Sequence, residues 1–451
     1  MSYDDISWQK LTELPERPVR RFVQPIIDFL EIEAVGGIVL IAATIVAVTL
    51  ANSPWHEDAA AFWSMPIGVQ IGAHSIVLSL RSAINDGLMT LFFFVAGLEI
   101  KRALVLGELR DPRVAALPIA AAIGGMIVPA ALYLAFQFGK PGARDWGVVM
   151  ATDIAFVVGC LALLGKSVPL RLRVFVLSLA IIDDVGAVLV IAVGYSSHIE
   201  LMWLAAGAIV VGVVVAFRRV GVRSILAYYF IGGLAWFAVH ESGLHATIVG
   251  IVLGLLTPAH PWIGLNRLQA MTRAFRQSLR DRTGSEPEEG AETQAGKLRS
   301  IAFAARETLS PLERLEIGLH PWVSFLVLPL FALANAGVPL SIAGLYDPVV
   351  GAVVVGLVLG KPLGILGASW LAIRLGLTVR PEGLSWAVIG AAGALCGIGF
   401  TMALFIANLA FDDTLLVSAS LGILVASLIS AVLGVALLAL ALRAKAREKP
   451  G

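Results

Sequence analysis

The chain consists largely of apolar runs that are long enough to cross a lipid bilayer. Of its 451 residues, 58% are hydrophobic and only 14% are charged. A helix needs about 20 apolar residues to cross the ~30 Å hydrocarbon core, because each residue adds ~1.5 Å. The pattern therefore predicts an all-α polytopic membrane protein with twelve transmembrane helices. Their expected limits are 35–52, 83–100, 114–136, 147–164, 173–195, 201–217, 224–239, 244–256, 319–336, 350–373, 385–409 and 415–441.

Basic residues divide sharply between the two ends of these runs. If the first run starts in the cytoplasm, 29 of the 33 Lys and Arg residues fall on the cytoplasmic side and three on the opposite side. Lys and Arg are enriched in cytoplasmic loops of membrane proteins. We therefore expect both termini in the cytoplasm, with tails at 1–34 and 444–451 and a membrane domain at 35–443. The basic residue left over, Lys361, lies inside the tenth run.

One connection on the outer face has the pattern of a β-hairpin. Residues 66–80 (PIGVQIGAHSIVLSL) have strand-like stretches on either side of Gly72–His74. An exposed strand edge can pair with a second copy of the chain, so the hairpin predicts a homodimer. A merely solvated connector is the alternative interpretation.

The cytoplasmic connection at 257–318 is the longest loop. Its middle, Thr283–Gly296, is rich in Glu, Gly, Ser and Thr, so we expect it to be disordered. The following segment, Lys297–Leu309, has the pattern of an amphipathic helix at the membrane surface. Nothing in the loop indicates a catalytic or nucleic-acid-binding domain.

Asp183 and Asp184 are adjacent carboxylates in the middle of the fifth run. A carboxylate at that depth costs at least ~2.5 kcal/mol, so both side chains must face protein or water, and a functional site is the default interpretation. Neighbouring helix positions differ by ~100°, which lets one carboxylate line a cavity while the other meets a partner. A purely structural buried pair is the alternative.

The fourth and eleventh runs have features of interrupted helices. Thr152 and Asp153 lie near the middle of the fourth run, where they can satisfy freed backbone groups. The eleventh run holds four glycines within ten residues, each of which costs ~1 kcal/mol of helix propensity relative to alanine. Unwound helix ends expose partial charges that a nearby Asp and Lys can offset.

Lys361 is the candidate for that cation. It lies in the sequence GLVLGKPLGILG, where Gly356, Gly360 and Gly364 form a small face that lets another helix approach closely. A structural salt bridge with a carboxylate is the alternative role. Cys160 and Cys396 both fall inside apolar runs, so we expect buried thiols rather than disulfides or metal ligands.

Three further polar residues lie near the ends of runs. Asp86 lies early in the second run, where a vestibule residue without a transport role is equally compatible with the pattern. Glu99 closes that run beside a cluster of basic residues. His245 opens the eighth run, where a local hydrogen bond is the alternative to a role in the pH response.

These motifs together resemble the bacterial NhaA-type Na⁺/H⁺ antiporters. The resemblance is carried by TDIAF with Asp153, LAIIDDVGA with Asp183 and Asp184, GKPLGI with Lys361, and CGIGFTM at 396–402. INDGLM, GLEIKR, AAIGGMIVPA, SGLHAT and LHPW match as well. The match extends over about residues 30–440, apart from an insertion at 257–312.

The resemblance implies a secondary transporter rather than an enzyme. Such a transporter exchanges cytoplasmic Na⁺ or Li⁺ for external H⁺, is electrogenic and pH-regulated, needs no cofactor, and lies in the bacterial inner membrane. Runs three to five and ten to twelve would form inverted repeats, with runs four and eleven broken and crossing. Asp184 would be the principal cation ligand, assisted by Asp183 and Thr152, while Asp153 and Lys361 would offset the charges of the broken helices.

The family's pH-response region lies on the cytoplasmic side, and the chain departs from it in part. Glu99, Arg102, Glu316 and His320 match the charged pattern. Three further positions differ from this pattern. Ala103 stands where relatives carry Glu, Glu313 where they carry Lys, and Ile317 where they carry His. These departures leave the pH set point open.

Three other classes of protein share some of these features. An intramembrane aspartyl protease also uses two aspartates, but on separate helices, whereas Asp183 and Asp184 are adjacent. A sodium-coupled organic-anion symporter could share the broken-helix design, although Lys361 beside Asp183 favours proton coupling. A membrane sensor that transports nothing is the third alternative.

Overall fold

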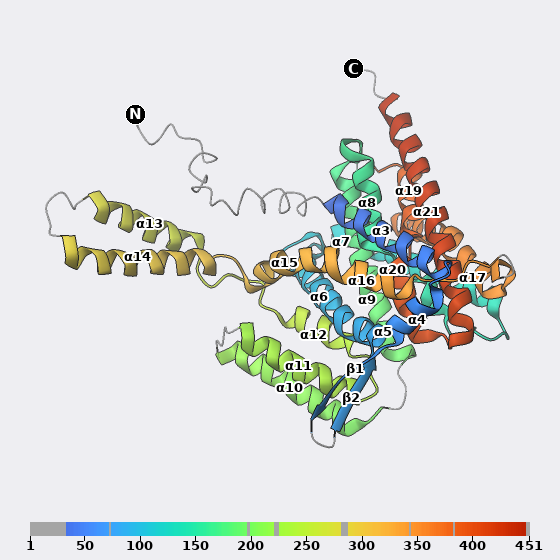
Figure 1. Ribbon diagram of the computed structural model, residues 1–451. Helices are drawn as coiled ribbons and strands as arrows, with labels where there is room; N and C mark the ends of the chain where they lie inside the picture. The colour runs from blue at the N-terminus through green and yellow to red at the C-terminus, as the bar shows by residue number, and fades with distance from the viewer. Residues whose placement is uncertain are drawn as a thin grey trace.

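The computed structural model describes residues 33–71, 74–195, 199–220, 225–280, 287–341, 344–381 and 384–447, and the N-terminal tail lies outside the described residues. Each of the twelve apolar runs coincides with helical segments (Figure 1). Within the described part, seven helices are long and apolar enough to cross a membrane, or up to nine if each bent pair counts as one span. The chain is therefore a polytopic helical membrane protein.

The first half of the chain begins with helices that flank a small sheet. Its elements are α3 (Glu33–Ala51), α4 (His56–Ser64), β1 (Pro66–Ile71), β2 (His74–Ser79), α5 (Leu80–Ser82), a π-helical segment (Ala83–Leu88), α6 (Met89–Val105), α7 (Pro112–Gln137), α8 (Ile154–Leu163), α9 (Leu170–Gly194), α10 (Leu201–Val220), α11 (Ile225–Glu241) and α12 (Thr247–Leu256).

In the second half, the described regular elements are all helices, joined by non-helical connections. Its elements are α13 (Leu265–Arg280), α14 (Pro287–Glu307), α15 (Pro311–Trp322), a π-helical segment (Val323–Val327), α16 (Leu328–Asn335), α17 (Pro348–Val355), a second π-helical segment (Gly356–Gly360), α18 (Lys361–Arg374), α19 (Trp386–Cys396), α20 (Phe400–Ala410) and α21 (Asp413–Arg447).

The β-hairpin expected at 66–80 is present. β1 and β2 pair antiparallel, with Pro66 opposite Ser79 and Ile71 opposite His74. Leu80 leaves the sheet and begins α5, where the Ser79 hydroxyl accepts a hydrogen bond from the Ser82 N–H. The hairpin ends one residue before the expected limit because Ser79 acts as a helix N-cap.

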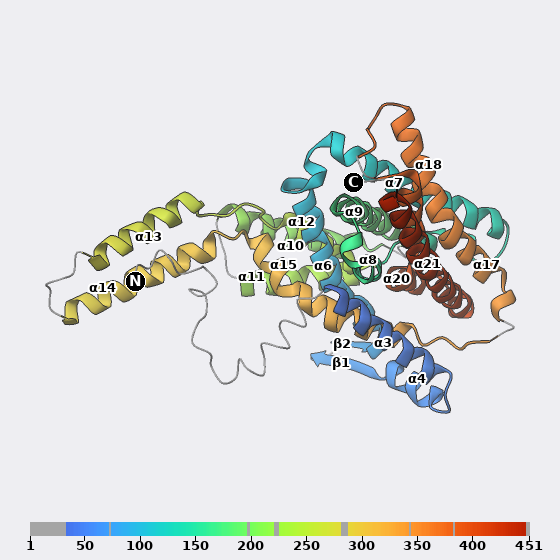
Figure 2. The same ribbon diagram turned by 90° about the horizontal axis from the view of Figure 1, so that it is seen from above.

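The expected disorder of Thr283–Gly296 is wrong for residues 287–296, which begin α14. This segment contains Ala, Glu and Gln, which are good helix formers, and α14 packs against α13. The two helices extend together away from the bundle (Figures 1 and 2). At their base, the N–H groups of Trp262 and Ile263 both bond to the Glu307 carbonyl. The amphipathic helix expected at Lys297–Leu309 lies within α14 as far as Glu307.

The ninth expected span begins earlier than its apolar run. α15 starts at Pro311, before the expected limit of 319, because Ser310 and Glu313 form a reciprocal capping box. The charged residues Glu313, Arg314 and Glu316 are thereby part of the helix rather than of the loop.

Glycines let two pairs of helices approach at the level of the backbone. A Cβ atom at Gly364 would lie 2.1 Å from the Gly124 carbonyl oxygen, so α18 and α7 touch directly. A Cβ atom at Gly250 would lie 2.3 Å from the Thr90 carbonyl oxygen, which joins α12 to α6. The small face expected along the tenth run therefore has the role that its spacing predicts.

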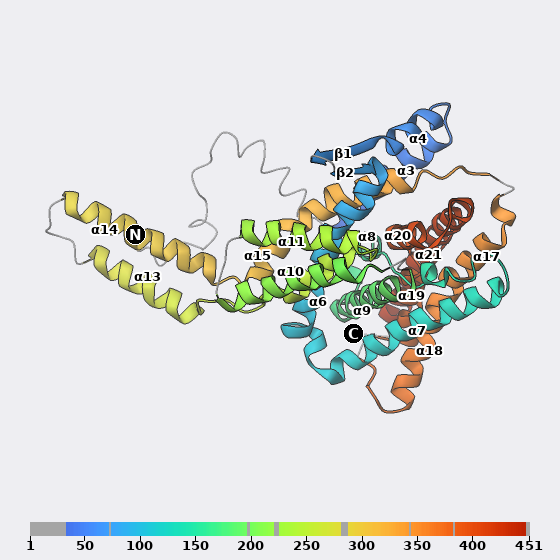
Figure 3. The same cartoon turned by 90° about the horizontal axis from the view of Figure 1, so that it is seen from below.

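The tightly packed core lies around α9. α7 packs against both α9 and α18, and α19 packs against α18 and α21 (Figure 3). Most of the buried apolar residues of these helices belong to one continuous cluster. This arrangement places the middle of α9 beside the ends of α8, α19 and α20.

Candidate functional site

The middle of α9 carries the two adjacent carboxylates into the core. Asp183 is 0% exposed and Asp184 is 2% exposed. Two ionised carboxylates without partners at this depth would be strongly destabilising, so their surroundings decide what each can do.

Asp183 has a cationic partner. The Lys361 Nζ lies 2.6 Å from Asp183 Oδ2, and both side chains are completely buried. Lys361 is the first residue of α18 and follows the π-helical segment Gly356–Gly360 directly. A buried charge pair of this kind compensates its desolvation only when the contact is close and further hydrogen bonds are present.

Thr152 supplies one of those hydrogen bonds. Its Oγ1 lies 2.7 Å from Asp183 Oδ2 and 2.9 Å from the Cys396 carbonyl oxygen. Cys396 is the last residue of α19, where helix carbonyls lack partners within the helix. The negative end of α19 therefore meets the Thr152 hydroxyl, which also joins it to the charged pair of Asp183 and Lys361.

Asp153 stabilises the beginnings of two helices at once. Its Oδ1 accepts the Phe156 N–H of α8 at 3.0 Å, and its Oδ2 accepts the Thr401 N–H of α20 at 3.0 Å. The Thr401 hydroxyl also donates to Oδ2. A carboxylate is favourable at a helix N-terminus because of the partial positive charge there. Asp153 meets two such ends.

The backbone between these helices is irregular in both places. Residues 151–153 are non-helical before α8, and residues 397–399 separate α19 from α20, which bend by 47° relative to one another. The Asp153 N–H bonds to the Ile398 carbonyl at 2.7 Å and joins the two stretches directly. We call the group Thr152, Asp153, Ile398 and Thr401 the crossing.

Asp184 differs from its neighbour because, among the described residues, no salt bridge to it is found. Its Oδ1 is buried without a hydrogen-bond partner in the described part of the chain, and so is Asp183 Oδ1. A native buried polar atom without a partner calls for an explanation, and an ion or water ligand is one. Glu99 on α6 and Asp153 are near enough for their charges to act on Asp184. The surroundings are therefore suited to a cation.

A dedicated binding site for a tightly held metal ion is not evident. Among the described residues, no group of three or more His, Cys, Asp or Glu side chains could hold one. Carboxylate, hydroxyl and carbonyl oxygens around Asp184, Thr152 and Cys396 suit a hard monovalent cation that binds and leaves.

Two of the expected site residues, Asp86 and His245, lie outside the crossing. Asp86 is in the π-helical segment, and the Trp236 indole donates to its carbonyl oxygen at 3.3 Å. The His245 Nε2 lies 3.0 Å from the Tyr195 carbonyl oxygen. The structure does not bring either residue to the crossing, and the hydrogen bond of His245 joins it to a residue 50 positions earlier in the chain rather than to a local group.

The charged residues expected to respond to pH form a separate group near the C-terminal end of α6. Arg102 Nη1 lies 2.6 Å from Glu316 Oε1 on α15. His320 is exposed one turn further along α15, and Ile317 is 68% exposed. Glu313 serves the capping box with Ser310.

Sequence reasoning missed three contributors to the crossing. Thr401 lies within the motif CGIGFTM, and its N–H and hydroxyl both donate to Asp153, a contact that the motif alone does not indicate. The Cys396 carbonyl leaves no signal in the sequence, because any residue supplies one. Ser427 on α21 accepts the Phe400 N–H at 3.1 Å, and only the tertiary structure brings these residues together.

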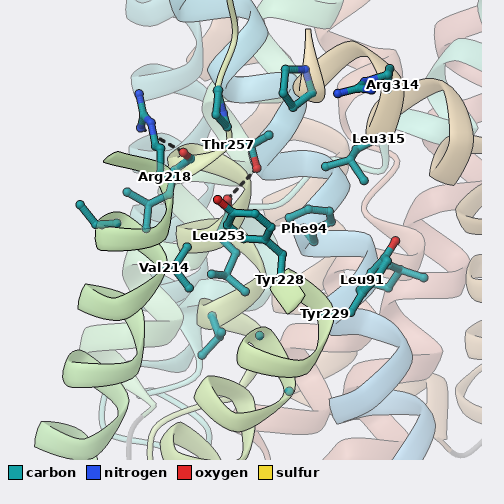
Figure 4. Close-up of a pocket in the computed structure, with 18 of the residues that line it drawn as sticks. Leu91, Phe94, Val214, Arg218, Tyr228, Tyr229, Leu253, Thr257, Arg314 and Leu315 are labelled. Carbon is teal, nitrogen blue, oxygen red and sulfur yellow. Dashed lines mark hydrogen bonds between the residues drawn. The ribbon is translucent and has the colours of Figure 1, made fainter. Parts of the chain in front are cut away.

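A separate cavity of about 640 Å³ lies between α6, α10, α11, α12 and α15 (Figure 4). Its walls are mainly apolar, with Leu91, Phe94 and Leu253 among them. At one end Arg218 donates to the Leu256 carbonyl at 3.0 Å. Its lining includes neither Asp183 nor Asp184, so we treat it as distinct from the crossing.

Comparison with known proteins gives a consistent picture. Residues 27–438 match the family described as Na⁺/H⁺ antiporter 1. The chain is 52% identical over 439 residues to Na(+)/H(+) antiporter NhaA 2 of Acidiphilium cryptum (strain JF-5), covering 97% of each chain. It is 50% identical to Na(+)/H(+) antiporter NhaA of Rhizobium meliloti (strain 1021), over 94% of this chain and 96% of the relative. It is 47% identical to Na(+)/H(+) antiporter NhaA 2 of Vibrio vulnificus (strain CMCP6), over 94% of each.

Proposed function

The chain belongs to the Na⁺/H⁺ antiporter 1 family, and from this premise we propose that it exchanges cytoplasmic Na⁺ for external H⁺. One observation carries the residue-level proposal: Asp183 is paired with Lys361, whereas the adjacent Asp184 is buried without a counter-ion. We assign Asp184 as the principal cation ligand, with Asp183 and Thr152 as further oxygen donors.

The mechanism that we propose is competition for the same oxygens. A carboxylate oxygen that coordinates Na⁺ cannot hold a proton at the same time. Protonation of Asp184 also removes the charge that attracts the cation. If only the Na⁺-bound and the protonated site change sides, each Na⁺ that leaves is replaced by H⁺, and exchange is obligatory.

The architecture that we propose has twelve spans, with two broken helices that cross at the bilayer midplane. The match of all twelve expected runs to helices supports the number. The non-helical residues before α8 and between α19 and α20 support the two breaks, whose charges Asp153 and Lys361 offset. α7–α9 and α17–α21 are then the inverted repeats of the family.

Several finer properties belong to the same proposal. The protein also accepts Li⁺, is electrogenic and regulated by pH, and needs no cofactor beyond its transported ions. It lies in the bacterial inner membrane with the tails 1–34 and 444–451 in the cytoplasm. It forms a homodimer through the hairpin at 66–80, so deleting the hairpin should convert dimers to monomers by light scattering in detergent.

The organic-anion symporter is not supported. In the described part of the chain, the buried cation at the crossing is already paired with Asp183. The relatives compared above are all named as Na⁺/H⁺ antiporters.

The test is Na⁺-induced proton movement in proteoliposomes that contain the purified protein. Wild type should move protons when Na⁺ is added, and Asp184→Asn should not, although it is inserted and folded. Asp58→Asn is the matched control, because Asp58 is an exposed residue of α4. Exchange by Asp184→Asn at the wild-type rate would contradict the assignment of Asp184, and a lack of exchange by wild type would contradict the function.

A further inference from the structure

The N-terminus of α20 is stabilised from two sides by different elements. Asp153, from the stretch before α8, takes the Thr401 N–H. On the other side, Ser427 Oγ accepts the Phe400 N–H at 3.1 Å, and Phe400 is the first residue of α20. Ser427 is 5% exposed and lies in the middle of the long helix α21. The next helix along the chain, α21, therefore supplies one of the two caps.

Ser427 is the outermost member of a continuous set of contacts that reaches the carboxylates. Phe400 and Thr401 are consecutive, and Thr401 bonds to Asp153. The Asp153 N–H then bonds to the Ile398 carbonyl, and the neighbouring Thr152 bonds to Asp183. The chain of contacts thus runs from α21 through the crossing to α9.

Aromatic packing makes the two helix starts move together. The Phe400 ring meets the Phe156 ring edge to face, with ring centroids 5.7 Å apart. Phe156 belongs to the first turn of α8, and its N–H is the other group that Asp153 caps. A displacement of Phe400 is therefore passed to both helices that Asp153 holds.

A neighbouring serine provides a comparison within the same helix. Ser430 lies three residues after Ser427 and is 1% exposed. Its Oγ has no hydrogen-bond partner among the described residues. Removing the Ser430 hydroxyl therefore breaks no bond, whereas removing the Ser427 hydroxyl leaves the buried Phe400 N–H unsatisfied.

We propose that Ser427 is a positioning residue for cation binding. By holding the start of α20, it fixes Thr401 on Asp153 and, through the crossing, Thr152 on Asp183. This inference rests on the proposed exchange of Na⁺ for H⁺ at Asp184. It adds α21 to the elements that determine the geometry of the site.

The test compares Ser427→Ala, Ser427→Thr and Ser430→Ala in proteoliposomes, with wild type as reference. Loss of one buried hydrogen bond corresponds to about a fivefold change in an equilibrium constant. Ser427→Ala should therefore raise the apparent KM for Na⁺ about fivefold, with a smaller effect on the maximal rate. Because a weaker Na⁺ site competes less well with protons, its activation curve should also move to higher pH. Ser427→Thr restores the acceptor and should bring both values back, and Ser430→Ala should match wild type.

Each other outcome has a distinct meaning. Wild-type KM and pH profile in Ser427→Ala would overturn the proposal, and so would equal defects in Ser427→Ala and Ser430→Ala. If Ser427→Ala does not accumulate in the membrane, Ser427→Cys replaces it, since a thiol is a weaker acceptor of similar size. An unchanged KM in Ser427→Cys would then overturn the proposal. Failure of exchange in wild type would contradict the proposed function instead.

Discussion

At the scale of single residues, the pair of Lys361 and Asp183 determines what the site can tolerate. Both side chains are completely buried, so each needs the other to offset its desolvation. The pair also explains why Asp183 and Asp184, although adjacent, have different electrostatic surroundings. One is neutralised by a fixed cation, and the other is left for an exchangeable cation or a proton.

Replacing one member of this pair should destabilise the protein strongly. Lys361→Ala and Asp183→Ala should each lower the free energy of unfolding by ~3–5 kcal/mol, because each leaves a buried charge unpaired. The double variant should lose clearly less than the sum of the two. Thermal unfolding of the purified variants in detergent measures this cycle, and simple additivity would mean that the two charges do not interact.

Asp145, a residue outside the crossing, makes the stability of the protein depend on pH. It lies between the spans Pro112–Gln137 and Trp146–Leu163. Partial burial raises the pKa of its carboxyl to about 6, the charge of Asp412 adds to the rise, and Arg144 opposes it. Because the folded state binds the proton more tightly than the unfolded state, this group makes the protein less stable as the pH rises from ~4 to ~6.

Asp145→Asn should therefore stabilise the protein above pH 6 and leave its stability unchanged below pH 4. The carboxyl is about half exposed, so solvent screening reduces the gain to the order of 1 kcal/mol. Thermal unfolding of both proteins at pH 4, 5, 6 and 7.5 provides the measurement. A constant difference at all four values would contradict this origin of the effect.

At the scale of elements, the direct contact between α7 and α18 positions the cation of the pair. Gly364 touches the Gly124 backbone, and Lys361 lies one turn before Gly364 on α18. Any side chain at 364 must push the two helices apart. The position of Lys361 therefore depends on Gly364, a residue without a side chain.

Gly364→Ala should reduce both stability and exchange. Overpacking at such a contact costs ~1–3 kcal/mol, and the displacement of α18 should lengthen the contact between Lys361 and Asp183. Gly367→Ala is the matched control on the same helix, because an added Cβ there meets nothing within 4 Å. Equal losses in the two variants in exchange and thermal-unfolding assays would contradict close packing as the cause, because the higher helix propensity of alanine would by itself stabilise both.

The sequence predicted those elements whose local signals agree with the tertiary structure. The apolar runs gave the helices, and the alternating pattern at 66–80 gave the hairpin. The composition of 283–296 was misleading, because residues 287–296 include good helix formers and begin α14, a helix that packs against α13. The early start of α15 at Pro311 was missed because a capping box outweighed the charged residues that follow it.

The site was predictable only as far as unusual residues mark it. Asp153, Asp183, Asp184 and Lys361 stand out because charges are expensive in a membrane. The Cys396 carbonyl and the Ser427 hydroxyl do not stand out, because their roles depend on which backbone groups the breaks leave unpaired. Such partners become visible only once the helices are placed.

At the scale of the whole molecule, the charged group around Arg102 and Glu316 lies apart from the crossing. The pair joins α6 to α15, and Ile317 and Ala103 are the neighbouring positions where an ionisable side chain is missing. We propose that a proton and Na⁺ compete for Asp184, and that this competition sets the pH dependence of exchange without a separate sensor.

The double variant Ala103→Glu, Ile317→His should keep nearly the same activation midpoint. Ile317 is exposed and Ala103 is partly buried near the end of α6, and we expect neither new side chain to change the competition at Asp184. Exchange is measured from pH 6 to 9 at several Na⁺ concentrations, and the midpoint should fall as Na⁺ rises. A midpoint that moves by a full unit independently of Na⁺ would indicate a separate sensor.

Thr152 connects two distant parts of the molecule through one hydrogen atom. Its hydroxyl has a single proton but two acceptors within reach, Asp183 on α9 and the Cys396 carbonyl at the end of α19. While Asp183 is ionised, the charge-assisted bond to it is the stronger one. Once Asp183 is protonated, its carboxyl can donate to Thr152, and the hydroxyl is released to turn towards Cys396. The direction of the Thr152 O–H bond thus depends on whether Asp183 on α9 is ionised, and it determines whether the Cys396 carbonyl at the end of α19 has a hydrogen-bond donor.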